Sequence, residues 1–245
     1  MTSIDLNADV GEGYDDESLI ALVSSVNIAC GGHAGDTDSM ARAIEAARGS
    51  GAAIGAHPGY ADRAGFGRSE ATVPLPEVRR QLLEQLETLY RVADGYAAPV
   101  EHVKPHGALY NHAANDPILA MCIAEAVAEF DRGLRLVGLA GSALPAAGIE
   151  LGLSVAHEGF ADRAYRSDGR LVSRDVEGAL VTDPDEAAKR AVAMARREPI
   201  ATIDGGSLTF RTDTICLHAD TPGAVAMAHR IRDELARAGI GIARL

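Results

Sequence analysis

Sulfur-containing and large aromatic residues are scarce in this chain, and their scarcity excludes several classes of protein. Tryptophan is absent, and cysteine occurs only at positions 30, 122 and 216. These cysteines are odd in number, far apart and never in a CxxC arrangement. Disulfide-stapled domains use several paired cysteines and cysteine-rich zinc modules use closely spaced ones, so neither class fits. We expect reduced thiols and a cytoplasmic protein.

Basic residues and long apolar runs are also few. Lys and Arg total 23 against 35 Asp and Glu, a formal net charge of −12. Binding to a nucleic-acid backbone requires a basic patch, so we expect no nucleic-acid partner. No stretch approaches the ~18 apolar residues of a membrane helix, and residues 1–5 lack the basic start and apolar run of a signal peptide. We therefore expect no membrane association.

Strand-like and helix-like segments alternate along the whole chain, without a linker or a low-complexity segment. The expected strands cover residues 4–10, 26–30, 53–57, 102–106, 134–139, 153–157, 200–203 and 214–218. Helices are expected after Asp36 or Thr37, over 76–93, from Asp116-Pro117, between the fifth and sixth strands, from Asp183-Pro184 and from Thr221-Pro222. The pattern predicts an α/β fold, a single-domain parallel (β/α) barrel of seven or eight strands over residues 1–245.

The first strand argues for the barrel over a doubly wound sheet. Asp5, Asn7 and Asp9 occupy one face of this strand, whereas its other face is apolar. A strand between two helical layers should be apolar on both faces. A polar lumen inside an apolar outer face fits a barrel better.

The stretch VKPHGALYN, residues 103–111, is the clearest candidate for an active-site wall. His102, Lys104 and His106 alternate, so a strand directs them to the same face. Lys104 is a candidate cation for a carboxylate or a phosphate, although it could instead bridge two acids inside the barrel. We expect replacement of Asp9, Lys104 or His106 to reduce turnover more than stability.

Six polar side chains are candidate catalytic residues: Asp9, His57, Lys104, His106, Glu158 and His218. Asp9 and Glu158 are the candidate carboxylates for activating water or holding a metal. The histidines at strand ends are candidate proton relays or metal ligands, although each could be a structural histidine. We assign His112 and His229 to the solvent-exposed surface.

An internal echo pairs two segments that follow strands. Residues 57–64 read HPGYADRA and residues 157–164 read HEGFADRA, so Asp62-Arg63 and Asp162-Arg163 occupy equivalent positions. The arginines could face an anionic substrate, which a planar guanidinium suits. Alternatively, the pairs form local salt bridges that brace the loops.

Six motifs spread from Asp5 to Val225 resemble those of the LamB/YcsF family: DLNADVGEG, NIACGGHAGD, GAHPGYADRAGFGR, VKPHGALYN, EGFADRAYRSDGRLVSR and HADTPGAV. Two positions depart from the family pattern, Gly32 in place of an aromatic residue and Ala219 in place of glycine. Neither departure removes an ionisable group. The resemblance implies a barrel of the glycoside hydrolase/deacetylase type.

The resemblance also implies ATP-dependent opening of 5-oxoproline to L-glutamate, in a complex with 5-oxoprolinase subunits B and C. The chain has no GxxxxGK[ST] phosphate loop, so ATP, with Mg²⁺, would bind by another route or with help from those partners. We expect no tightly bound organic cofactor. The candidate substrate-binding residues are Asn7, Glu12, His33, Asp62, Arg63, Asn111, Asp162, Arg163, Arg174 and Asp220.

Two alternatives come from other functional classes. A metal-dependent hydrolase or deacetylase could work without ATP, with Asp9, His33 and His57 as ligands. Against it, the first strand lacks a His-x-His pattern and the chain lacks HExxH. The second alternative is a non-catalytic protein that binds a ligand for a partner.

Overall fold

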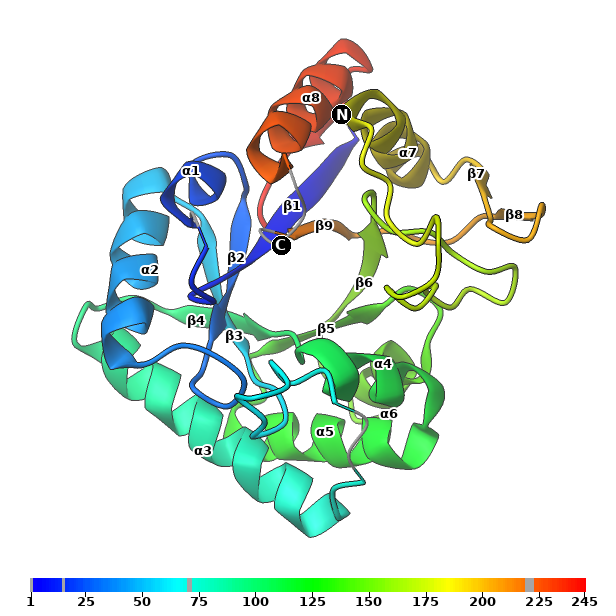
Figure 1. Cartoon of the computed structure of the whole chain (residues 1–245). Coiled ribbons are helices and arrows are strands. Elements are labelled where there is room, and N and C mark those ends of the chain that lie inside the picture. The colour runs from blue at the N-terminus through cyan, green and yellow to red at the C-terminus, as the bar shows by residue number, and fades with distance from the viewer. Residues whose placement is uncertain (1, 15, 70–71, 219–222) are drawn as a thin grey trace.

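A closed parallel barrel of seven strands forms the centre of the molecule (Figure 1). The computed structural model describes residues 2–14, 16–69, 72–218 and 223–245. In spatial order the barrel strands are β1 (Ser3–Val10), β2 (Ser25–Ala29), β3 (Ala53–His57), β4 (Val100–Val103), β5 (Arg135–Leu139), β6 (Val155–Phe160) and β9 (Thr214–His218). Pairing of β9 with β1 closes the barrel. A short β10 (Gly241–Ile242) lies parallel to the first residues of β1.

Helices surround the barrel in chain order, except that α4 lies inside the ring, against α5 and α6 (Figure 1). They are α1 (Asp16–Ile20), α2 (Thr37–Ser50), α3 (Leu75–Asp94), α4 (Gly107–Asn115), α5 (Pro117–Phe130), α6 (Ala143–Glu150), α7 (Pro184–Arg196) and α8 (Ala224–Arg237). Asp36 caps α2 in a capping box with Ser39, and Asp116 and Asp183 cap α5 and α7 as predicted. The cap predicted at Thr221-Pro222 lies outside the described residues.

The two faces of β1 confirm the barrel and exclude a doubly wound sheet. Leu6, Ala8 and Val10 are buried in the apolar core, whereas Asp5 and Asp9 are buried among polar side chains of other barrel strands. At the amino end of the strands, the Asp5 carboxylate accepts hydrogen bonds from hydroxyl groups of β2 and β9. The lumen is therefore a polar layer inside an apolar shell.

A glycine on β3 makes room for one of the lumen side chains. A Cβ atom at Gly55 would lie 2.1 Å from Nε2 of His102. The His102 ring fills this space, is fully buried and contacts Oδ1 of Asn27 through Nε2 at 2.9 Å. His102 therefore belongs to the lumen layer, as the alternation of residues 102–106 predicts.

The strand expected at 200–203 is not part of the barrel. β7 (Ile200–Ala201) pairs antiparallel with β8 (Ser207–Leu208) in a separate two-stranded sheet, and β6 pairs directly with β9. The physical reason is local: the Gly205-Gly206 pair allows the chain to turn back on itself after only two paired residues. Of the seven or eight barrel strands expected from the sequence, the structure has seven.

Two helices, α1 and α4, are absent from the sequence pattern described above, and β4 ends at Val103, before Lys104. Pro105 has no N–H to donate to the ladder, which ends regular pairing there. The backbone stays beside β3, because the Lys104 N–H donates to the Ala56 carbonyl and the His106 N–H to the Pro58 carbonyl. Within the described part of the chain, no helix has both the length and the apolar character needed to cross a membrane. All three cysteines are unpaired.

Candidate functional site

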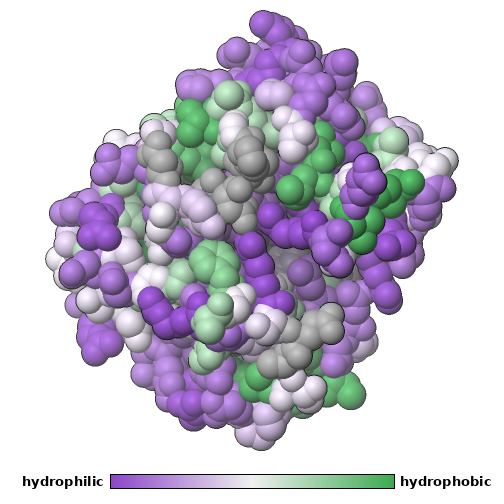
Figure 2. Space-filling view, in the orientation of Figure 1, coloured by the Kyte–Doolittle hydropathy of each residue, from purple (hydrophilic) through white to green (hydrophobic). Residues whose placement is uncertain are grey.

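A cavity of about 580 Å³ opens at the carboxyl ends of the barrel strands. Its polar and aromatic lining includes Asp9, Glu12, His57, Arg68, Lys104, His106, Asn111, His112, Phe160, Arg163, Arg174 and His218. In the orientation of Figure 1, hydrophilic side chains surround a hollow in the middle of this face (Figure 2). Parallel barrels place their chemistry at this end of the strands.

One ammonium group between two carboxylates forms the floor of the cavity. Nζ of Lys104 lies 2.9 Å from Oδ1 of Asp9 and 2.9 Å from Oε1 of Glu158, and all three side chains are buried. Burial lowers the pKa of Lys104, but Asp9, Cys216 and Glu158 together outweigh burial and hold that pKa well above its usual value. Burial likewise raises the pKa of Asp9, but His57 and Lys104 outweigh it, so Asp9 stays ionised. The floor therefore carries fixed charges shielded from solvent.

The thiol of Cys216 completes the surroundings of Lys104. Its Sγ lies 3.0 Å from Nζ, and burial together with Asp9 raises the pKa of Cys216 well above its usual value. Cys216 is therefore a neutral thiol. The Lys104 ammonium also lies 5.5 Å from the centre of the Phe160 ring, within cation–π range.

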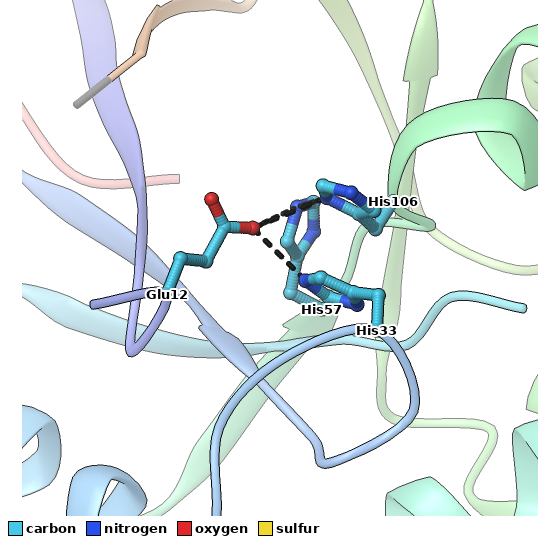
Figure 3. A group of neighbouring side chains, drawn as sticks. All are labelled: Glu12, His33, His57 and His106. Carbon is cyan, nitrogen blue, oxygen red and sulfur yellow. Dashed lines mark hydrogen bonds and ion pairs between the residues drawn. The ribbon is translucent and has the colours of Figure 1, made fainter. Parts of the chain in front are cut away.

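Glu12, His57 and His106 form one wall of the cavity, and the buried His33 packs against His106 without lining the cavity (Figure 3). Oε1 of Glu12 lies 2.9 Å from Nε2 of His33 and 3.1 Å from Nδ1 of His106. Nε2 of His57 lies 3.0 Å from the same nitrogen of His106 and 3.3 Å from Oδ2 of Asp9. This wall joins the floor of the cavity through the contact between Asp9 and His57.

The protonation of this wall follows from its burial. Burial lowers the pKa of His106 and lowers that of His33 to about 4, so both rings are neutral at pH 7. Burial raises the pKa of Glu12, but its contacts with His106 and His33 outweigh burial and leave the pKa below its usual value. Glu12 is therefore a carboxylate beside neutral imidazoles.

The loop after β3 holds two of these rings. Nε2 of His106 donates to the carbonyl oxygen of Phe66 at 2.9 Å, and Phe66 has a φ of +54°, in the left-handed region. Such backbone strain in a non-glycine residue is typical of functional sites. At the next position, Gly67, a Cβ atom would lie only 2.7 Å from Cβ of His33. The loop thus packs directly against the histidine wall.

Gly32 also has a packing role. A Cβ atom at position 32 would lie 2.3 Å from Oε1 of Gln85 on α3. The Gln85 amide accepts from the Gly59 N–H at 3.0 Å and donates to the Gly59 carbonyl at 2.8 Å. The small residue therefore admits a glutamine that braces the loop after β3, next to His57.

His218 also lines the cavity and has its own carboxylate. Nδ1 of His218 lies 2.9 Å from Oδ2 of Asp162, which is fully buried. The ring of His218 stacks on that of Phe160, with centroids 5.4 Å apart. Asp162 therefore orients His218 rather than facing the cavity itself.

The two arginines of the internal echo have different surroundings. Arg163 is buried, lines the cavity and donates from Nη2 to the Val172 carbonyl, and burial lowers its pKa to about 10. Arg63 lies away from the cavity lining and donates from Nη1 to the carbonyls of Gly31 and Gly35. Asp62 accepts hydrogen bonds from the backbone of its own loop. The equivalent positions thus serve different purposes.

The other candidates divide between the lining and deeper layers. Asn111 and Arg174 line the cavity, whereas Asn7 lies beneath it and donates to Glu158 at 3.0 Å. Glu12 and His33 belong to the group of side chains around His57 and His106. Of the predicted metal ligands Asp9, His33 and His57, Asp9 contacts this group only through His57. Asp220 lies outside the described residues. None of these positions tests the predicted roles, which stay predictions.

Sequence reasoning missed several cavity residues, including Arg68 and His112. His112, expected at the surface, contacts the hydroxyl of Tyr60 through Nδ1 at 3.3 Å. Helical spacing is the signal that could have revealed it, since Ala108, Asn111, His112 and Asn115 share one face of α4 and all line the cavity. Arg68 carries no signal beyond its place in a long loop.

Comparison with known proteins gives the chain a family. The profile of the LamB/YcsF family matches residues 4–245. Proteins named as the A subunit of 5-oxoprolinase are similar over nearly their whole length: that of Heliobacterium modesticaldum is 49% identical, covering 98% of this chain and 96% of the relative, and that of Methylococcus capsulatus is 47% identical, covering 99% and 96%.

Solved structures agree with this assignment. The crystal structure of the lactam utilization protein from Thermus thermophilus superposes with a TM-score of 0.93 at 40% identity, covering 99% of this chain and all of that one. A family 4 carbohydrate esterase from Streptomyces lividans shares the fold alone, with a TM-score of 0.53 at 12% identity, covering 98% and 91%. The comparison thus supports a (β/α) barrel fold of the kind found in that esterase. From the full-length match of sequence and fold, the chain belongs to the LamB/YcsF family.

Proposed function

We propose that this chain is the A subunit of a cytoplasmic 5-oxoprolinase, which opens 5-oxoproline to L-glutamate at the expense of ATP together with subunits B and C. The relatives with this name support the proposal, as does the similarity to a lactam utilization protein. The observation that carries it is the buried Asp9–Lys104–Glu158 network below a cavity of about 580 Å³. This volume is ample for a five-membered lactam.

The rim of the cavity suits an anionic substrate. Arg68, Arg163 and Arg174 all line it, and guanidinium groups bind carboxylates and phosphates through paired hydrogen bonds. The substrate 5-oxoproline carries a carboxylate, and phosphorylation of its amide oxygen by ATP would add a second anion. These arginines are therefore the proposed anion-binding residues.

The floor suits proton transfer to and from water. Asp9 is ionised and contacts Nε2 of His57, which in turn contacts His106. An ionised carboxylate such as that of Asp9 can take a proton from attacking water and return it to the leaving ring nitrogen. Lys104 already contacts two carboxylates and a thiol, so its proposed role is to keep Asp9 ionised rather than to bind phosphate.

An unstrained amide resists attack by water unless its carbonyl is activated. Transfer of the terminal phosphate of ATP to the amide oxygen would make the ring carbon electrophilic and leave ADP. Water adding to that carbon would then break the C–N bond, and a second water would hydrolyse the resulting acyl phosphate to L-glutamate and inorganic phosphate. Since the sequence has no P-loop motif, we propose that the partner subunits supply part of the site for ATP and Mg²⁺. A hydrolase acting without ATP is the second candidate, and the imidazole wall favours it.

The test is reconstitution with purified components. Glutamate release from 5-oxoproline is measured for this chain alone, for candidate subunits B and C alone, and for all three together, each with and without ATP and Mg²⁺. We expect release only from the complete mixture with ATP. Rapid ATP-dependent turnover by the isolated chain would contradict the need for partners, and turnover without ATP would favour the second candidate.

A second measurement distinguishes catalysis from ligand delivery. Asp9→Asn in this chain should abolish glutamate release by the complete mixture while 5-oxoproline still binds. Unchanged release would mean that this chain only presents the substrate to its partners. His229→Gln, on the exposed face of α8, serves as the matched control and should leave release unchanged.

A further inference from the structure

We propose that Glu12, His33, His57 and His106 bind a divalent transition-metal ion of the zinc class. One potential ligand atom from each of the four lies within 4.8 Å of all the others. Their side chains converge from the loops after β1, β2 and β4 and from the end of β3 (Figure 3). The proposal stands on this cluster and does not depend on the proposed function.

His57 and His106 each have one ring nitrogen bonded to a backbone carbonyl and one that faces the other ring, and the two facing nitrogens are too close to carry a proton each. Nδ1 of His57 lies 2.7 Å from the Lys104 carbonyl oxygen, and Nε2 of His106 lies 2.9 Å from that of Phe66. A carbonyl oxygen only accepts, so both of these nitrogens carry a proton. The remaining nitrogens, Nε2 of His57 and Nδ1 of His106, are 3.0 Å apart. One proton at most fits between them.

At least one unshared electron pair therefore points into a space already rich in negative charge. Oε1 of Glu12 lies 3.1 Å from Nδ1 of His106 and 3.7 Å from Nε2 of His57. Electron pairs and a carboxylate oxygen that converge within such distances repel one another unless a cation lies between them. An outer N–H held by a backbone carbonyl is also how proteins orient metal-ligating histidines.

The third imidazole fits the same interpretation. Nε2 of His33 lies 2.9 Å from Glu12, whereas its Nδ1 is buried and has no hydrogen-bond partner among the described residues. The His33 ring stacks on that of His106 with centroids 3.6 Å apart and planes within 2°. Both stacked rings contact the same oxygen, Oε1 of Glu12. His33 therefore completes a set of three imidazole nitrogens and one carboxylate.

A second cluster, Asp9, Cys216 and His218, also has metal-ligand geometry but is already occupied by a cation. Nζ of Lys104 lies 2.9 Å from Asp9 and 3.0 Å from Cys216. A divalent ion beside that ammonium would meet strong repulsion. Imidazole nitrogens with one carboxylate, and no thiolate, are typical ligands of Zn²⁺ and of Co²⁺ as its substitute.

The direct test is metal binding by the 245-residue chain without partners or substrate. After treatment with a chelator and its removal, isothermal titration with ZnCl₂ should show one site per chain. His57→Gln and His106→Gln should each weaken Zn²⁺ binding at least ~100-fold. Loss of a group that only orients a ligand costs up to ~100-fold in affinity, so loss of a ligand itself should cost at least that much. His229→Gln should bind as tightly as the unaltered chain. Absence of a stoichiometric site in the unaltered chain would overturn the proposal.

A spectroscopic experiment on the unaltered chain tests the site even if the histidine variants do not fold, and it shows which cluster holds the ion. Titration of the unaltered chain with CoCl₂ should give visible absorption of a nitrogen- and oxygen-ligated ion, without a thiolate-to-metal charge-transfer band. Cys216→Ser should leave that spectrum and the affinity unchanged. A charge-transfer band that disappears in Cys216→Ser would place the ion in the second cluster and contradict the proposal.

Discussion

At the scale of the residue, Lys104 is the group on which the floor of the cavity depends. The sequence left two interpretations, a cation for the substrate or a bridge between barrel acids. The structure shows the bridge, with Nζ 2.9 Å from both Asp9 and Glu158. This contact also changes the expected stability of a Lys104 variant, because removing one partner leaves buried charges without compensation.

Lys104→Met should therefore lower both stability and turnover, and a second substitution should separate the two effects. We expect the free energy of unfolding to fall by about 3–5 kcal/mol, the usual cost of breaking a buried ion pair. Adding Glu158→Gln should restore part of that loss, because one unpaired carboxylate disappears. Turnover of the assembled complex should stay at least ~100-fold low in both variants. Urea denaturation and glutamate release measure the two quantities, and full recovery of turnover in the double variant would contradict this role.

At the scale of the element, the two ADRA loops show how one sequence pattern serves two positions. The loop after β3 directs Arg63 toward the carbonyls that follow β2, where it ties two loops together. The segment after β6 buries Arg163 in the cavity wall, where Val172 fixes its guanidinium. The first is a brace between loops and the second is part of the lining.

Alanine at each of these arginines should therefore give opposite results. Arg163→Ala should raise the KM for 5-oxoproline by about tenfold or more, since one guanidinium–carboxylate contact contributes about 1.5–3 kcal/mol. Arg63→Ala should leave KM nearly unchanged and lower the free energy of unfolding by about 1 kcal/mol. Each variant is the control for the other, with kinetics and urea denaturation measured on both. Equal KM effects would show that Arg63 also reaches the substrate.

At the scale of the whole molecule, the polar lumen makes the fold sensitive to acid. Burial, and then the charge of Lys104, lowers the pKa of His102 to about 3. In the unfolded chain a histidine has a pKa of about 6.5. Between these pH values His102 binds a proton in the unfolded state but not in the folded state. Its contribution to the free energy of unfolding is therefore fully present above pH ~6.5 and is lost as the pH falls toward 3.

The stability of the chain should therefore decline as the pH falls from about 6 to about 4, with His102 contributing up to ~1.4 kcal/mol per pH unit. His102→Gln keeps a side chain that can donate to Asn27 but removes the titrating ring, so its decline should be shallower by that amount. His229→Gln should decline as steeply as the unaltered chain. Urea denaturation at several pH values measures the slopes, and parallel slopes for His102→Gln and the unaltered chain would contradict the assignment.

The sequence by itself determined the features that depend on neighbours along the chain. Alternation in residues 4–10 predicts a polar lumen and an apolar outer face, and both are present. Aspartates before prolines predict the starts of α5 and α7. Such features follow from backbone geometry over a few residues, because side-chain direction and helix capping are local properties.

Only the tertiary structure decided how distant segments meet. It placed Glu12 and His33 against His57 and His106, directed Arg63 away from the cavity and Arg163 into it, and removed 200–203 from the barrel. None of these outcomes follows from local pattern. Closing the barrel fixes which strand ends face one another, and the contacts of Lys104 with Asp9 and Glu158 exist only because β1, β4 and β6 surround one lumen.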